Sequence, residues 1–160
     1  MNIGRSDIDW KSLSHNEIDR IIAERIEADN KRIEANGGKK SKRAGYILER
    51  IAEINNLREA DKEAQDGKVK KNRFIRRHNL HPEEDLRALQ LMILTLDFPA
   101  PDYSVMRVKS DAGKVRDIVK QKYFPWRILH HAIMRVIEED VYRNLIYDTS
   151  AVSYTHLRAH

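Results

Sequence analysis

The chain contains no cysteine among its 160 residues. Disulfide bonds, thiolate zinc sites and thiol catalysis are therefore excluded, and a reducing compartment such as the cytoplasm is expected. Long apolar runs are also absent. None approaches the roughly 20 residues needed to cross a bilayer, so no membrane partner is expected. The first ten residues are polar and lack the apolar core of a secretion signal, so secretion is not expected.

Glycine is scarce, with six residues, and these form neither a phosphate-binding loop nor a dinucleotide-binding fingerprint. The seven histidines lack the spacing of metal ligands. His130 and His131 are adjacent, so on a helix they point about 100° apart and cannot grip one ion as an i, i+4 pair would. No arrangement of Ser, His and Asp is recognisable as a catalytic triad. Neither a metal site nor a catalytic residue is therefore expected within this chain.

Charge is plentiful and slightly unbalanced. Lys and Arg total 30 against 25 Asp and Glu, which gives a net charge of +5. With 41% hydrophobic and 34% charged residues, the composition indicates a soluble, helix-rich chain with one core. The positive balance is only mild evidence for a polyanionic partner, because many basic proteins have none.

The first helix is indicated by its two ends. Ser14 and Glu17 stand in the spacing of a capping box, and isoleucines follow at helical intervals. Gly37 and Gly38 can adopt the left-handed backbone that ends a helix. The segment after them, "GGKKSKR", reads as a flexible cationic hinge, so we expect a boundary after residue 43.

Two more helices are predicted before the hairpin. One runs through Ile47 and Leu57 and leads into the charged segment Arg58–His78, most of whose surface is expected in water. The other starts at Pro82, because proline at a first turn gives up a donor that has no partner there. Its expected buried stripe comprises Leu86, Leu89, Met92, Ile93 and Leu96.

Strands are expected over residues 103–108 and 114–119, with "KSDAG" as the turn between them. Pro125 should then begin a helix with a broad buried face. That face comprises Ile128, Leu129, Ala132, Ile133, Val136 and Ile137. The predicted fold class is α+β, mostly helical, with one β-hairpin.

The hairpin carries the strongest candidate site. Lys109, Lys114 and Arg116 would be presented together by a two-stranded ribbon, as phosphate recognition requires. The alternative is an ordinary solvated hairpin surface, which the residues alone favour. Similarly, Phe124 and Trp126 beside Arg127 could stack on bases or could simply pack the start of the helix.

The stretch "GKVRDIVKQKYFPWRILHHAIMRVIEEDVYRNLIYDTS", residues 113–150, resembles the first conserved block of bacterial, retroviral-type reverse transcriptases. That block has a basic hairpin, a joint of aromatic, Pro, Asp and Arg, a helix like "IVHHAIMNVLEP", and a phrase like "FIYDSYA". Upstream, "NNLREADKEAQDGKVKKNRFIRRH" and "NLHPEEDLRALQLMIL" are similar to the family's N-terminal helices. The resemblance spans about residues 46–151.

The resemblance implies the fingers portion of a right-hand RNA-directed DNA polymerase, as found in group II introns and retrons. Its partners would be an RNA template, a DNA primer and deoxynucleotides, and its cofactor Mg²⁺. The residues implied to touch the triphosphate of the deoxynucleotide are Lys109, Lys114 and Arg116. Those implied to touch nucleic acid are Arg127, Lys70, Lys71 and Arg73. Trp126 departs from the pattern, because the family has Asp at that place.

The palm carboxylates that would hold the metal are not found in the chain, so by itself it is expected to be inactive. Residues 1–43 are expected to form an N-terminal helix and hinge, and residues 44–151 a partial polymerase domain. Val152–His160 resembles a translated sequencing adapter, with a natural strand as the alternative. The competing function is a non-catalytic basic helical module that binds nucleic acid or a protein partner.

Overall fold

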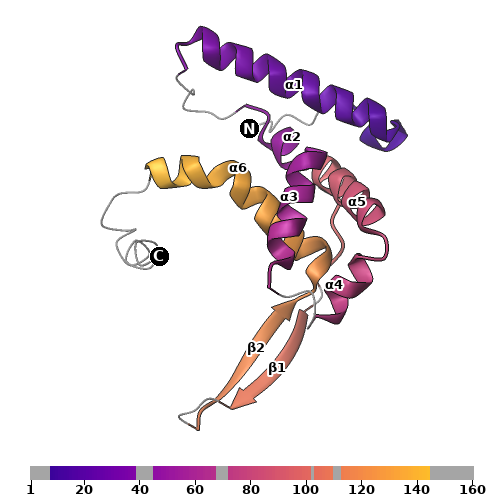
Figure 1. The fold of residues 1–160 in the computed structure, drawn as a ribbon, viewed down its shortest axis with the longest axis vertical. Coiled ribbons are helices and arrows are strands. Elements are labelled where there is room, and N and C mark those ends of the chain that lie inside the picture. The colour runs from indigo at the N-terminus through magenta and orange to yellow at the C-terminus, as the bar shows by residue number, and fades with distance from the viewer. Residues whose placement is uncertain (1–7, 39–44, 68–71, 102, 110–112, 145–160) are drawn as a thin grey trace.

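The computed structural model describes residues 8–38, 45–67, 72–101, 103–109 and 113–144. A single β-hairpin projects from a helical body on the side away from α1 (Figure 1). The helices are α1 (His15–Ala35), α2 (Ile47–Ala52), α3 (Ile54–Gln65), α4 (Arg73–His78), α5 (Pro82–Thr95) and α6 (Ile128–Asn144). The strands are β1 (Tyr103–Lys109) and β2 (Val115–Gln121), paired antiparallel. The predicted class, α+β and mostly helical with one hairpin, is confirmed.

Both predicted ends of α1 are confirmed. Ser14 N donates to Glu17 Oε2 at 2.8 Å, and Glu17 N donates to Ser14 Oγ at 3.4 Å, which completes the capping box. At the other end Gly37 and Gly38 have φ values of +68° and +76°. The Gly38 N–H donates to the Ile33 carbonyl at 3.0 Å, closing the helix as left-handed glycine allows.

The helix predicted through Ile47 and Leu57 is in fact two helices. Glu53 lies between α2 and α3 with ψ near the extended range, at 127°. The break leaves carbonyls at the end of α2 without helical partners. Gln90, fully buried on α5, donates to the Ala52 carbonyl at 3.0 Å, and Asn56 donates to the Ile51 carbonyl at 3.1 Å. Side-chain amides from elsewhere therefore stabilise a break that no proline or glycine marks.

One buried cluster joins α1, α2, α3, α4, α5 and α6. Leu86, Leu89 and Ile93 of the stripe predicted for α5 are buried. Met92 is only half-buried. The prediction that Leu96 is buried is wrong. Helix α5 ends at Thr95, and Leu96 has a left-handed backbone with φ of +56° and is 63% exposed.

The start of α6 is also built as predicted. Phe124 keeps an extended backbone within the turn Tyr123–Arg127, so the helical run begins at Pro125 and continues into α6. Ile128 and Ala132 are fully buried. The rest of the predicted apolar face is half-buried, namely Leu129, Ile133, Val136 and Ile137.

Ion pairs fix α1 to α2. Asp29 is buried on α1 and accepts from Arg32 at 2.6 Å and from Arg50 of α2 at 3.1 Å. The boundary predicted after residue 43 falls within residues 39–44, which lie outside the described residues, so it stays a prediction. No helix in the described ranges is long and apolar enough to span a bilayer.

Candidate nucleic-acid interface

The pairing of the hairpin decides which cations can act together. Val108 lies opposite Arg116, and Lys109 lies opposite Val115. Directly opposed residues of an antiparallel pair share a face, and successive residues alternate between faces. Arg116 and Lys109 are therefore on opposite faces of the ribbon. The three cations predicted to act together are therefore not all on one face, and Lys114 precedes β2, outside the paired register.

The side of the ribbon that bears Arg116 is here called the cationic face. Its members are Ser104, Met106, Val108, Arg116, Ile118 and Lys120. It has two cations and no acid among these residues. The Lys120 ammonium lies 3.6 Å from the Met106 sulfur, on the same face.

The opposite side is nearly neutral. It bears Arg107 and Lys109 together with Asp117. Arg107 Nε donates to Asp117 Oδ1 at 2.9 Å, so one of the two cations is paired across the strands. Both sides are open to solvent, since every described strand residue is exposed except half-buried Val108. A phosphate group that approaches the ribbon is therefore attracted more strongly to the cationic face.

Helix α4 adds a second group of cations beside the base of the hairpin (Figure 1). Arg73, Arg76 and Arg77 are all exposed on it, and the Arg73 guanidinium lies 4.9 Å from the centre of the Phe74 ring. Only Arg73 was among the predicted nucleic-acid contacts. Lys70 and Lys71, predicted with it, lie outside the described residues. Arg76 and Arg77 were missed, although the run "RFIRRH" signals them.

The rings at the joint between β2 and α6 pack against neighbouring side chains. The Trp126 ring packs against Phe98, with centroids 5.6 Å apart. The Phe124 ring is nearly parallel to the His78 ring, at 6.2 Å and 12°. Both rings therefore pack the joint, while Arg127 is exposed beside them.

A buried ionic cluster anchors this joint to the helices. His78 of α4 places Nδ1 2.6 Å from Asp85 Oδ2 of α5 and Nε2 3.1 Å from Asp61 Oδ1 of α3. The Tyr123 hydroxyl, at the end of the hairpin, donates to the Asp61 carboxylate and lies 3.1 Å from the Asp61 carbonyl oxygen. Three helices and the hairpin exit thus meet at one charged group. Sequence reasoning missed this cluster, because its members are far apart in the chain.

The cluster sets the charges of its members. Burial lowers the pKa of His78, but the carboxylates of Asp61 and Asp85 outweigh burial, so the pKa is raised above its ordinary value. Burial likewise opposes ionisation of Asp61, yet its contacts with His78, Tyr123 and Gln65 hold the pKa of this carboxyl below its ordinary value. Burial and the neighbouring Asp61 raise the pKa of Tyr123. These shifts favour the imidazolium form of His78 between the two carboxylates.

The two adjacent histidines of α6 have different surroundings, since His131 lies near an acid and His130 is exposed. His131 Nδ1 lies 3.6 Å from Glu63 Oε2, and its side chain is 23% exposed. Burial and the charge of Arg127 lower the pKa of His131. His130 is exposed, with its ring edge-on to His131 at 6.0 Å. The adjacent pair therefore does not converge on a common point.

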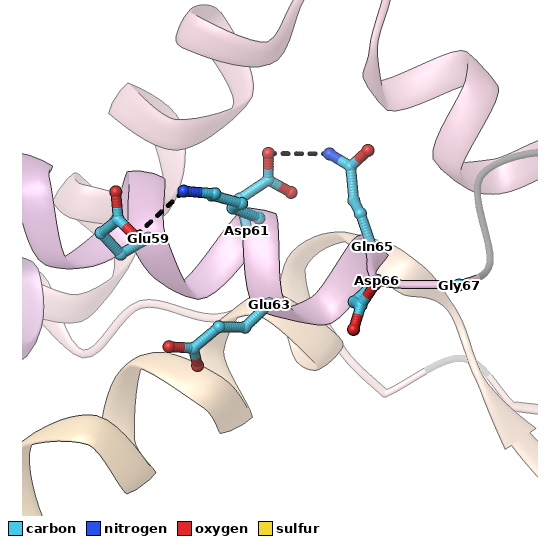
Figure 2. Close-up of a pocket in the computed structure, with 7 residues that line it drawn as sticks. Glu59, Asp61, Glu63, Gln65, Asp66 and Gly67 are labelled. Carbon is cyan, nitrogen blue, oxygen red and sulfur yellow. Dashed lines mark hydrogen bonds and ion pairs between the residues drawn. The ribbon is translucent and has the colours of Figure 1, made fainter.

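A hollow on the described surface is unsuited to phosphate. It measures about 700 Å³ along the C-terminal half of α3 (Figure 2). Four carboxylates line it, from Glu59, Asp61, Glu63 and Asp66. Figure 2 shows the Gln65 amide meeting the Asp61 carboxylate, a hydrogen bond of 2.9 Å. Lys62 also lines the hollow, but the four carboxylates outnumber it and repel phosphate.

No family model, curated protein or solved structure matches the chain. Function must therefore be argued from the surface itself. Within the part of the chain that the structure describes, no group of three or more His, Asp or Glu side chains could hold a metal ion. What the described ribbon and α4 offer is a set of exposed cations, whose chemistry suits the binding of phosphate groups.

Proposed function

We propose that this chain forms fingers of an RNA-directed DNA polymerase, whose cationic face binds the phosphates of the incoming deoxynucleotide. The observation that carries the proposal is that Arg116 and Lys120 share one side of a projecting ribbon, with no acid among the strand residues of that side. The resemblance of residues 113–150 to the first conserved block of reverse transcriptases agrees with it.

The cations of the hairpin suit different parts of that task. A guanidinium is planar and always charged, and its donors match phosphate oxygens in pairs, so Arg116 would orient the triphosphate. Lys114, which precedes β2, would act as a point charge. Mg²⁺, held by palm carboxylates that the resemblance places downstream of residue 151, would supply further stabilisation of the charge that develops during in-line attack.

The buried cluster at the base of the hairpin would give the cationic face a fixed position. A ribbon that is exposed on both sides gains little rigidity from its own packing. Tyr123, at its exit, bonds Asp61, which also lies beside the His78 imidazolium. Electrostatic binding of a reacting phosphate works best when the charges need not reorganise. The exposed cations Arg73 and Arg127 would contact the backbone of the template and primer.

Primer extension tests the proposal. The natural protein that carries this chain should encode a Tyr-x-Asp-Asp turn downstream of residue 151. With an RNA template, a DNA primer and deoxynucleotides it should lengthen the primer, and a chelator should stop this by removing Mg²⁺. Product length on a denaturing gel is the readout. A folded protein that incorporates no deoxynucleotide would contradict the proposal.

The second candidate is a basic module that binds nucleic acid without catalysis. The observation that favours it is that the cationic face and α4 both present exposed cations, which can bind phosphate without any catalytic group. Under this reading the natural protein would retain oligonucleotides in a salt-dependent manner but would never extend a primer. The same extension experiment therefore separates the two functions.

A further inference from the structure

A second, smaller pocket lies where α4 meets the base of the hairpin. It measures about 230 Å³, somewhat below the roughly 300 Å³ at which pockets for drug-sized ligands begin. Its lining comes from α4, from α5 and from the segment that joins β2 to α6. The pocket is separate from the cationic face, because no lining residue belongs to β1 or β2.

Two phenylalanine rings form its apolar walls. Phe74 comes from α4 and Phe124 from the turn, and both are half-buried, so part of each ring is open. The Phe124 ring is held nearly parallel to the His78 ring, 6.2 Å away, which fixes its orientation before any ligand arrives. Flat rings that are held in place suit a planar, apolar-faced group such as a nucleobase.

The charge of the lining favours an anion. Arg77 and Lys122 both line the pocket, and the only acid among the lining residues described is Asp85. The Asp85 carboxylate is paired with His78 Nδ1 at 2.6 Å, so the two cations Arg77 and Lys122 face a single carboxylate that already has a partner. A ligand that has both an aromatic face and a negative charge would therefore satisfy the walls and the cations together.

We propose that this pocket holds one nucleotide of a single-stranded nucleic acid, with its base against Phe74 and Phe124 and its phosphate at Arg77 and Lys122. Nucleic acid combines planar bases with phosphates, which are the two kinds of group that the lining suits. The proposal does not depend on polymerase activity, because a non-catalytic module would use the same pocket.

Binding of two matched strands tests the assignment. The probes are a short fluorescent oligothymidylate and an abasic deoxyribose-phosphate strand of equal length, followed by fluorescence anisotropy. The wild-type chain should bind the oligothymidylate about 5- to 100-fold more tightly, because a stacked base is lost from the abasic strand. Phe124→Leu should remove most of this preference, and Phe74→Leu tests the other wall if the first variant does not fold.

The arginines of α4 supply the matched control. Arg77→Ala should weaken binding of both strands by about tenfold. Arg76→Ala removes the same charge from the neighbouring exposed residue, which does not line the pocket, and should weaken binding much less. Equal affinity of the wild type for the two strands, or equal losses of affinity in the two arginine variants, would overturn the proposal that the pocket holds a nucleotide. Because primer extension is not the readout, either result leaves the polymerase proposal to its own test.

Discussion

Replacing His78 with alanine is expected to lower the free energy of unfolding by about 3–5 kcal/mol. The side chain is 1% exposed and stands between the carboxylates of Asp61 and Asp85. Without it, two carboxylates lie close together in a partly buried site with no cation between them. Because whole domains are stable by only about 5–15 kcal/mol, the loss is large. Urea unfolding followed by circular dichroism measures it.

His81→Ala is the matched control for this change. His81 is 68% exposed and lies 3.8 Å from Glu84, so its loss should alter the unfolding free energy by less than about 0.5 kcal/mol.

A second comparison uses the pH dependence of stability. Because the folded-state pKa of His78 is raised above 6.5, its stabilisation is complete below that pH and is lost as the pH rises through the folded-state value.

The stability difference between wild type and a His78 variant should therefore depend on pH. Between wild type and His78→Gln, which keeps a polar side chain but no charge, the stability difference should shrink as the pH rises through that folded-state pKa. Asp61 has the opposite pH dependence, because its stabilisation is lost as the pH falls through its lowered pKa. A stability difference that does not vary with pH would rule out the charged cluster.

Leu89→Ala should lower the free energy of unfolding by about 2–5 kcal/mol. Leu89 is fully buried on α5, in the cluster that joins all six helices, so its removal leaves a cavity as well as losing apolar burial. The shift of the urea midpoint at unchanged slope is the measurement.

Leu80→Ala makes the same chemical change at a residue that is 71% exposed, and it should cost less than about 0.5 kcal/mol. Similar costs at the two leucines would mean that α5 does not pack through the face described. The comparison is a sensitive one, because only burial distinguishes the two sites.

The features that could be predicted from the sequence are those set by neighbouring residues. The capping box of Ser14 and Glu17 and the helix start at Pro82 each depend on a few consecutive side chains. The hairpin depends on two short strands and the turn between them. Such signals act over one or two turns of chain, so they can be recognised before the fold is known.

The features that were missed depend on contacts between distant residues. The break at Glu53 is stabilised by Gln90, 38 residues from the carbonyl that it binds. The cluster around His78 joins residues from three helices. The placing of Lys109 depends on the pairing register, and a shift of one residue moves every side chain to the other face. None of these can be derived from spacing along the chain.

The pair of substitutions Arg116→Ala and Lys109→Ala tests the central claim, that the cationic face binds the phosphates of the nucleotide. In primer extension by the natural protein that carries this chain, Arg116→Ala should raise the KM for deoxynucleotide by about 10- to 100-fold, because charge-assisted hydrogen bonds are lost. Lys109→Ala removes a charge from the opposite face and should raise the KM by less than about threefold. An unchanged KM in the Arg116 variant, or equal increases in both, would contradict the account.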